Sequence, residues 1–597
     1  MNTNDKLAGL RLAMKAAGID AYLVPSTDPH MSEYVAPRWQ GRSWLSGFTG
    51  SAGTLIVTKN WAGLWTDSRY FIQAEKELAG SRIDLMKLRV AHTPEYKEWL
   101  VENLEPDQTL GYAGNCLSLV AARDLDHKMG KHDIKVDATH DLLDYIWQDR
   151  PAAPQKPIYI QPEAYVDQSA KEKISRLREW MHRNRIDYFL VSALDHQAWL
   201  LNIRGSDIDY NPLMVSYLGV SAEGKSDWFV GPQRVDKAWA SSLDLELFTY
   251  KATAGRLIEL HGQGQRIGID PSTTNLAIYE AAGGHTTLQK SSPIPAWKAI
   301  KNDKATSHIK NAMARDGLAI LRLRRWLDSE EAKQKTEYEI VNQLTAFRSA
   351  LPNYKGDSFG AIVGWKGNGA IVHYDPPREG SAEVGERGIL LVDSGGQYLD
   401  GTTDITRTFC LGDPTPAEKQ HFTLVLQGMI DLSLARFPQG TSGVQLDILA
   451  RQYLWNDSLN YGHGTGHGVG YFLNVHEGPA GISSNPRSKT TQYPLEAGMV
   501  FSNEPGYYLE GEYGIRCENL VQVVETSPGW LAFDTLTMFP FERKLIDSDM
   551  LSHRQIQWLD TYHQQVWEEM KDLVEGEERS WLEEACEPLL IDAAQLI

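Results

Sequence analysis

The feature of this 597-residue sequence that most constrains its fold is a set of four acidic residues and one histidine spread over residues 391–518. The set begins with Asp393 in LVDSG and Asp404 in TTDITRT, and it continues with His467 in GHGTGHGVG. It ends with Glu504 in SNEPGYY and Glu518 in GIRCEN. Carboxylates suit Mn²⁺ and Mg²⁺, and imidazole extends the choice to other transition metals, so the set has enough ligands for two adjacent divalent cations. Such a site requires five short, distant segments to converge on one point.

The sequence around the two aspartates predicts a β-hairpin. The apolar run 388–392 is typical of a buried strand that ends at Asp393. After the turn-rich segment 394–400, residues 402–409 are predicted to form the returning strand. The aspartates lie eleven positions apart. A hairpin with this spacing allows both carboxylates to lie at the same level on neighbouring strands.

The other three residues also lie in segments suited to a crowded site. His467 is surrounded by glycines at 462, 464, 466, 468 and 470, which permit close backbone approach. Glu504 precedes the turn dipeptide Pro505-Gly506. The alternation around Glu518 predicts a strand, on which the neighbouring Cys517 points to the opposite face and is not a metal ligand.

Each of these residues has a simpler interpretation when it is taken alone. Single Asp and Glu residues are mostly solvated, a single histidine is mostly structural, and a glycine-rich run is often a flexible loop or a phosphate-binding loop. The run 462–470 lacks the G-x-G-x-x-G fingerprint and the Walker motif, and neither HExxH nor CxxC occurs near the set. The spacing alone therefore leaves open a metal site and these alternatives.

Taken in order, the motifs LVDSG, TTDITRT, GTGHGVG, NEPGYY and GIRCEN resemble those of the pita-bread metallopeptidases. Two further motifs, AIVHYDPP around His373 and NVHEGP around His476, most resemble the Xaa-Pro aminopeptidases, also called the aminopeptidase P family. The segments 34–54 and 64–75 are similar to the N-terminal domain of the long, three-domain cytosolic form of that family. The resemblance covers nearly the whole chain.

The resemblance implies a site with two metal ions. Asp404 and Glu518 are expected to bridge the ions, Asp393 to complete one of them, and His467 with Glu504 to complete the other. Glu504 is also the expected general base. Manganese is the ion that the resemblance implies, in agreement with the carboxylate-rich ligands, and cobalt or zinc remain alternatives.

The resemblance also implies roles for five residues near the metals. His373, His463 and His476 are expected to bind substrate and to transfer protons, because the imidazole pKa of about 6.5 lets the ring donate or accept a proton near neutrality. Arg516 is expected to lie near the substrate, and Tyr508 to help hold this region together.

The implied reaction is removal of the N-terminal residue from peptides with proline in second position, through a hydroxide held by two metal ions. An Xaa-Pro bond has no N–H, so the pocket is expected to fit the pyrrolidine ring. One alternative is a prolidase, which hydrolyses Xaa-Pro dipeptides only. Another is a creatinase-like enzyme, although that class lacks the acidic metal set. The third is an inactive pita-bread protein that binds peptides or histones.

The sequence predicts an α/β (α+β) chain with two similar α/β domains, 1–150 and 151–300, followed by a third part, 301–597. The resemblance implies that the first two are creatinase-type domains and that the third is a pita-bread catalytic domain with a C-terminal extension. Residues 6–28 resemble residues 173–195 at an offset of 167, and both predict a helix, a tight turn and a buried strand. A proline-rich segment, 151–157, and a second join near 291–304 separate the parts.

The catalytic part is predicted to begin with helices over 306–327 and, after a capping box at Thr336 and Glu339, to about 350. The segments GAIVGW and AIVHY are predicted to be strands. Helices are expected near 552–575 and 578–588. Their tryptophans, Trp558, Trp567 and Trp581, are expected to leave apolar surface for an interface.

Composition excludes several classes of protein. The net charge of −19 and the lack of a basic tract argue against nucleic-acid partners. A bilayer-spanning helix needs about 18–20 apolar residues, and no apolar run in the sequence approaches that length. The N-terminal segment has no apolar signal-peptide core. Four widely separated cysteines indicate reduced thiols. The sequence therefore predicts a cytoplasmic protein with no membrane partner, and the resemblance implies a homodimer.

Overall fold

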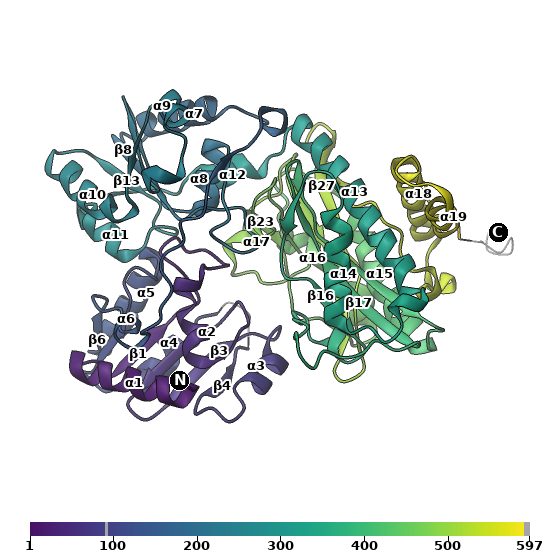
Figure 1. The fold of residues 1–597 in the computed structure, drawn as a ribbon, viewed down its shortest axis with the longest axis horizontal. Coiled ribbons are helices and arrows are strands. Elements are labelled where there is room, and N and C mark those ends of the chain that lie inside the picture. The colour runs from purple at the N-terminus through teal and green to yellow at the C-terminus, as the bar shows by residue number, and fades with distance from the viewer. Residues whose placement is uncertain (90–92, 590–597) are drawn as a thin grey trace. The chain divides into compact units, whose positions relative to one another are not determined.

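A computed structural model describes residues 1–89 and 93–589 of the chain. The chain forms two compact units, residues 1–294 and residues 295–597. Each unit is built from sheets covered by helices (Figure 1).

The first unit begins with a six-stranded sheet whose strand order is β4-β3-β2-β1-β5-β6. The strands are β1 (Ala21–Val24), β2 (Thr54–Thr58), β3 (Ala62–Thr66), β4 (Asp84–Lys87), β5 (Thr109–Tyr112) and β6 (Lys135–Asp137). Successive side chains of a strand point to opposite faces, so both faces of β1 carry apolar residues. Tyr22 and Val24 pack in the cluster that contains helix α1 (Thr3–Ala17). Leu23 packs in the cluster that contains α4 (Tyr96–Asn103) and α5 (Leu119–Gly130).

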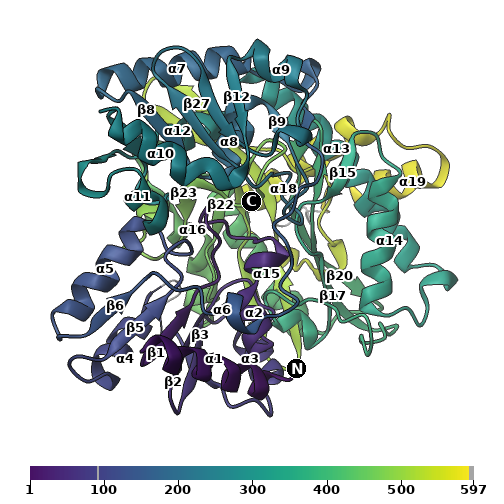
Figure 2. The same cartoon turned by 60° about the vertical axis from the view of Figure 1, so that its left-hand side comes forward.

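A second six-stranded sheet follows in the same unit, with the order β12-β11-β10-β8-β13-β14. Its strands are β8 (Tyr188–Val191), β10 (Tyr217–Ser221), β11 (Ser226–Phe229), β12 (Leu245–Phe248), β13 (Ile267–Ile269) and β14 (Leu288–Gln289). Helices α10 (Thr253–Gly262) and α11 (Leu276–Ala281) contribute Leu257 and Ile278 to its core (Figure 2).

The two sheets confirm the predicted repeat. In the first sheet, β1 pairs antiparallel with β2 and parallel with β5. In the second sheet, β8 pairs antiparallel with β10 and parallel with β13. The turn before the central strand also matches. Thr109 N donates to Asp20 Oδ2 at 2.8 Å in the first copy, and Arg266 N donates to Asp187 Oδ2 at 2.9 Å in the second.

The second unit contains a three-stranded antiparallel sheet, β16-β17-β20, and a larger antiparallel sheet of order β21-β28-β27-β24-β22-β23. The smaller sheet has β16 (Ile362–Trp365), β17 (Gly388–Ser394) and β20 (Ile405–Leu411). The larger has β21 (Arg436–Pro438), β22 (Gly466–Gly468), β23 (Glu477–Ile482), β24 (Val500–Asn503), β27 (Asn519–Ser527) and β28 (Trp530–Thr535). A hairpin of β25 (Gly506–Leu509) and β26 (Tyr513–Arg516) lies between β24 and β27 in the sequence.

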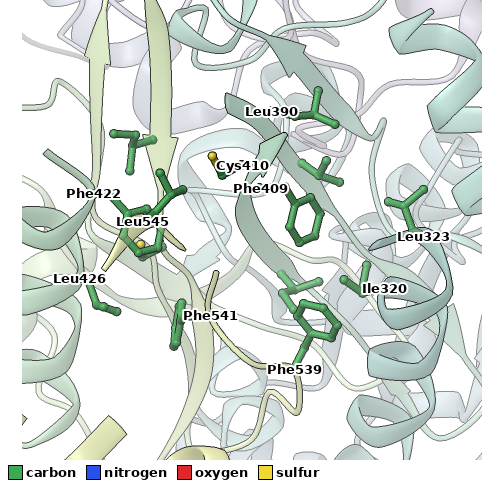
Figure 3. Close-up of a cluster of buried hydrophobic side chains, with 14 of the residues drawn as sticks. Ile320, Leu323, Leu390, Phe409, Cys410, Phe422, Leu426, Phe539, Phe541 and Leu545 are labelled. Carbon is green, nitrogen blue, oxygen red and sulfur yellow. The ribbon is translucent and has the colours of Figure 1, made fainter. Parts of the chain in front are cut away.

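Helices cover these sheets and complete the core of the second unit. They are α13 (Asp303–Leu327), α14 (Glu337–Ser349), α15 (Pro416–Ser433) and α16 (Gly443–Asn456). Figure 3 shows Ile320 of α13, Leu390 of β17, Phe409 of β20 and Phe422 of α15 in one buried cluster. The predicted capping box of α14 is confirmed, because Thr336 and Glu339 exchange side-chain to backbone hydrogen bonds.

The C-terminal helices α18 (His553–Met570) and α19 (Gly576–Ala585) give the three tail tryptophans local partners. Trp558, Trp567 and Trp581 are half-buried and pack against the core of the second unit. Trp558 stacks on Tyr562 at 5.2 Å between ring centroids, and Trp581 stacks on Phe539 at 6.0 Å. The tail therefore packs part of its aromatic surface against the core of the second unit, and the expected interface stays a prediction.

Two local predictions in the second unit were wrong. The segment AIVHY forms no strand: its first residue, Ala370, ends a 3₁₀ turn, η7 (Asn368–Ala370), and residues 371–374 are turn and irregular structure. The buried carboxylate of Glu337 fixes this turn instead, because it accepts hydrogen bonds from Trp365 N at 2.7 Å and from the Tyr374 hydroxyl at 2.7 Å. The segment 394–400 also contains a short strand, β18 (Gly396–Tyr398), which pairs with β15 (Tyr354–Asp357).

All four cysteines are free and buried, as expected for reduced thiols. Over residues 1–89 and 93–589, none of the helices combines the length and apolar character needed to cross a membrane.

Candidate metal centre

The smaller sheet of the second unit brings Asp393 and Asp404 together. Asp393 lies near the end of β17, where it pairs with Thr406 of β20, and Asp404 immediately precedes β20. The spacing allowed the two aspartates to lie at the same level in the hairpin, but the observed register does not place them opposite each other. Their ligand atoms nevertheless converge with that of Glu518, and the three lie within 4.8 Å of one another.

The larger sheet positions His467 and Glu504. His467 lies on β22 between Gly466 and Gly468, and Glu504 follows β24. A Cβ atom at Gly466 would lie 2.0 Å from Ser502 O, and one at Gly468 would lie 2.2 Å from Glu477 O. The two glycines are therefore required by close strand packing. As a result, His467 Nε2 lies 3.5 Å from both Asp404 Oδ2 and Glu504 Oε1.

Glu518 lies between β26 and β27 and connects the two sheets. Its backbone N donates to Thr406 O at 3.3 Å, and its Oε2 accepts from the Thr406 hydroxyl at 2.7 Å. Arg407 holds the other side of the residue through a bond from Nη1 to Glu518 O at 2.5 Å. The preceding Cys517 belongs to the apolar core and is not at the cluster, although residues 517 and 518 lie in the break between β26 and β27 and not on the single strand that the alternation predicted.

The electrostatics of the cluster fit bound cations. Burial raises the pKa of Asp404 well above its ordinary value, and the carboxylates of Glu518 and Asp393 raise that pKa further. Burial likewise raises the pKa of Glu518, followed by the effect of Asp393 and Glu504. Asp393 Oδ1 is buried and accepts no hydrogen bond from the part of the chain that the structure describes. Crowded, buried carboxylates of this kind are stabilised by a divalent ion.

The imidazole of His467 fits a metal in a second way. Its Nδ1 lies 3.0 Å from Gly468 O, so Nδ1 carries the proton that this contact needs. In the neutral ring Nε2 then has a lone pair, and this atom faces the two carboxylates of Asp404 and Glu504. A cation between them relieves the repulsion, and a backbone carbonyl on the other ring nitrogen is the usual support of a ligating histidine.

A hydrogen-bonded chain links Asp393 to His463. Arg516 donates from Nη2 to Asp393 Oδ2 at 2.5 Å and from Nη1 to the Tyr508 hydroxyl at 2.6 Å. Tyr508 in turn donates to His463 Nε2 at 2.8 Å, because His463 Nδ1 is engaged with Gly464 O at 2.7 Å. The structure thus brings Arg516, Tyr508 and His463 together next to the carboxylate cluster.

The other two predicted histidines differ in what the structure describes of them. His476 lies at the cluster, with its ring centroid 4.3 Å from that of His467 at an interplanar angle of 78°. His373 is half-buried in the irregular segment after η7, next to Tyr374, which Glu337 anchors. The position of His373 relative to the carboxylates stays a prediction.

Sequence reasoning missed the residues that support this site. The clearest is Glu477, the neighbour of His476 in NVHEGP. Its Oε2 accepts from Lys298 Nζ at 2.7 Å, and its Oε1 accepts from Lys301 Nζ. All three side chains are at most 2% exposed. The only sequence clue was an acidic residue inside a motif, because its partners lie more than 170 positions away.

We expect replacement of Glu477 by alanine to destabilise the second unit strongly. Removal of the carboxylate leaves two lysines buried without this partner, and breaking a buried ion pair on one side costs about 3–5 kcal/mol. Urea unfolding monitored by tryptophan fluorescence measures the effect. The exposed Glu510→Ala is the control, with an expected change within about 0.5 kcal/mol. Similar unfolding midpoints for the two variants would contradict the assigned role.

Comparison with known families places the whole chain. Residues 307–525 match the model of metallopeptidase family M24, and residues 529–589 match the C-terminal region of peptidase M24. Residues 6–146 and 149–305 each match a creatinase/prolidase N-terminal domain. The fold is thus two creatinase-type domains followed by a pita-bread metallopeptidase domain.

Individual relatives match from end to end. The probable Xaa-Pro aminopeptidase P of Laccaria bicolor is 40% identical, over 99% of this chain and 94% of that protein. The probable Xaa-Pro aminopeptidase P of Aspergillus niger is 38% identical, over 99% of each. This chain belongs to metallopeptidase family M24 and, within it, to the group of these full-length relatives.

Solved structures show the same relationship. The X-prolyl aminopeptidase of Caenorhabditis elegans, described as a cytosolic enzyme with a di-nuclear active site, is 33% identical with a TM-score of 0.94. The match covers 99% of this chain and all of that one. A Xaa-Pro dipeptidase of Bacillus anthracis covers 63% of this chain at 24% identity and a TM-score of 0.52, a likeness of fold alone.

Proposed function

We propose that this protein is a metal-dependent Xaa-Pro aminopeptidase, which removes the N-terminal residue from peptides with proline in second position. The observation that carries the proposal is the convergence of Asp393, Asp404 and Glu518, with His467 beside them, in a chain matched end to end by Xaa-Pro aminopeptidases. The complete acidic set argues against an inactive peptide-binding protein and against a creatinase-like enzyme.

The five acidic and imidazole residues are proposed to hold two divalent ions. Asp404 and Glu518 would bridge the ions, Asp393 would complete one, and His467 with Glu504 would complete the other. Two such ions supply Lewis acidity that polarises a carbonyl group and lowers the pKa of water. We propose Mn²⁺ as the native ion, since carboxylate oxygens dominate the donor set, with Co²⁺ and Zn²⁺ as alternatives.

The remaining residues are proposed to act on the peptide. The carboxylate of Glu504 accepts a proton from the attacking water. The leaving proline nitrogen has no hydrogen of its own in the peptide and must gain a proton as the bond breaks. His373, His463 and His476 are proposed to bind the substrate and to supply that proton, since imidazole exchanges protons near neutral pH. Arg516 and Tyr508 would keep Asp393 and His463 in place through the bonds described above.

A peptide assay separates this function from that of a prolidase. The Mn²⁺-loaded protein is incubated with an Xaa-Pro-Xaa tripeptide and, separately, with the corresponding Xaa-Pro dipeptide. We expect release of the free N-terminal residue and an intact Pro-Xaa dipeptide from the tripeptide. Hydrolysis of the dipeptide alone would favour a prolidase, and no hydrolysis of either would favour a binding protein. A tripeptide with alanine in second position is the control for proline specificity.

We also propose that the chain divides into domains at 1–150, 151–300 and 301–597, that it acts in the cytoplasm, and that it forms a homodimer. The C. elegans protein described as cytosolic supports the location. Light scattering tests the assembly. The expected mass is about twice that of the 67.0 kDa chain. A fully active species with the mass of one chain would contradict the dimer.

A further inference from the structure

Helix α16 contains a buried ion pair that none of the proposed roles uses. Arg451 Nε donates to Asp447 Oδ2 at 2.6 Å, and both side chains are at most 3% exposed. Buried charged pairs are costly to desolvate and are kept where they satisfy further polar groups or fix one conformation. What else these two residues contact therefore decides their role.

The remaining polar atoms of the pair hold the loop 461–465. Arg451 donates from Nη1 to Tyr461 O and from Nη2 to His463 O, each at 2.8 Å. The guanidinium also lies over the Tyr461 ring, 3.8 Å from its centroid. Asp447 Oδ1 accepts from the Thr465 hydroxyl at 2.6 Å. Three of the five loop residues are thus tied to one helix.

The loop needs such an anchor because its own backbone provides little order. Residues 461–465 form neither helix nor strand, and glycines at 462 and 464 widen the range of conformations. The loop nevertheless carries His463, whose Nε2 accepts the Tyr508 hydroxyl at 2.8 Å. The ring of His463 also packs against Tyr461 at 4.9 Å between centroids. Charge-assisted bonds to the carbonyls of Tyr461 and His463 hold this geometry more firmly than neutral bonds would.

We propose that Asp447 and Arg451 are positioning residues for His463. They lock the 461–465 loop so that the imidazole faces Tyr508 and the peptide site. The inference rests on the proposed function, because that function assigns the substrate role to His463. It extends the function by adding two residues that touch neither metal ligand side chains nor peptide.

Arg451→Lys is the primary variant, because lysine keeps the charge but has no planar fork that reaches Asp447 and both carbonyls together. We expect kcat/KM for an Xaa-Pro peptide to fall by about tenfold to a hundredfold, the size of effect that a small misplacement of an active group produces. Metal content is expected to stay at the parent value.

Arg234→Lys in the first unit is the matched control. Arg234 is also buried, donates to Asp207 Oδ2 at 2.6 Å and to Lys156 O at 2.9 Å, and lies outside the catalytic unit. We expect this variant to lose thermal stability to a similar degree while it keeps the parent kcat/KM. An equal loss of kcat/KM in both variants would overturn the proposal in favour of a general structural effect.

A double-mutant cycle with His463→Ala gives the decisive readout. If Arg451 acts through His463, Arg451→Lys is expected to reduce kcat/KM by less than about twofold once the imidazole is absent. The same fold loss in both backgrounds would overturn the proposal. Thr465→Val serves as a milder second variant should Arg451→Lys not fold. It removes the hydroxyl bonds to Asp447 and to the Tyr461 hydroxyl, each at 2.6 Å, and we expect a smaller loss with the same dependence on His463.

Hydrogen exchange separates this inference from the proposed function. Absence of Xaa-Pro hydrolysis by the parent protein would refute the proposed function. The anchoring of the 461–465 loop by Asp447 and Arg451 is tested on the backbone amides of residues 458–466. We expect these amides to exchange faster in Arg451→Lys than in the parent and in Arg234→Lys. Unchanged exchange in Arg451→Lys would overturn the positioning role whatever the activity.

Discussion

Replacement of Asp404 by alanine is expected to lower activity by more than about a hundredfold and to remove metal-dependent stabilisation. Asp404 is buried among the ligand atoms of Asp393 and Glu518 and lies 3.5 Å from His467 Nε2. It is therefore in reach of both proposed ions. Mutation of a residue that only supports a metal ligand lowers metal affinity or activity by about tenfold to a hundredfold. Loss of a proposed bridging ligand is therefore expected to lower activity further.

Thermal unfolding with and without Mn²⁺ checks the same variant without relying on turnover. A ligand that binds only the folded state raises the unfolding temperature. We expect Mn²⁺ to raise it in the parent and to have little effect on Asp404→Ala. Asp400→Asn is the matched control, because Asp400 is also buried but pairs with Arg315 at 2.6 Å. Parent-level turnover by Asp404→Ala would refute the ligand assignment.

Replacement of His476 by alanine is expected to separate catalysis from metal binding. The ring of His476 packs against His467, yet the proposed role concerns substrate and protons. General acid–base groups contribute about 10²–10⁴-fold, so kcat is expected to fall by about a hundredfold or more while both ions remain bound. Steady-state kinetics and elemental analysis of the purified variant measure the two effects. His373→Ala is expected to behave alike.

His308 offers a matched control for this prediction. It is a partly buried histidine of the same unit whose Nδ1 contacts the Tyr471 hydroxyl at 2.7 Å. His308→Ala is expected to keep both activity and metal. If His476→Ala remained folded but lost stoichiometric metal, its side chain would belong to the ion-binding set instead.

The sequence predicted the parts of this molecule that follow from local pattern. The capping box of helix α14 depends on Thr336 and Glu339, which are three positions apart, and the repeated helix–turn–strand units depend on matching residues within each copy. The convergence of Asp393, Asp404 and Glu518 was predicted through motif order, because the resemblance carried the long-range information that spacing lacked.

The failed predictions concern residues whose environment comes from distant segments. AIVHY has the composition of a strand. The carboxylate of Glu337, more than 30 positions earlier, instead accepts hydrogen bonds from the Tyr374 hydroxyl and from the Asn368 side chain in the neighbouring turn. The register of β17 with β20 places Thr406, not Asp404, opposite Asp393. The local partners of the tail tryptophans were not predicted either, because Phe539 and the core residues that these side chains contact are distant in sequence.

The residues that support the site could not be predicted from the sequence either, because their partners also lie in distant segments. Lys298 and Lys301 precede Glu477 by most of a domain, and Arg451 acts through backbone carbonyls, which any residue type provides. Such contacts leave no spacing pattern. They appear only when the three-dimensional arrangement is known.

Metal titration tests the central claim most directly. Metal-depleted protein is titrated with Mn²⁺ while release of the N-terminal residue from an Xaa-Pro-Xaa tripeptide is followed, and bound metal is counted in parallel. The two-ion site formed by Asp393, Asp404, His467, Glu504 and Glu518 predicts that activity rises from near zero and levels off at two ions per chain. Full activity in the metal-free protein, or saturation without any bound ion, would contradict the account.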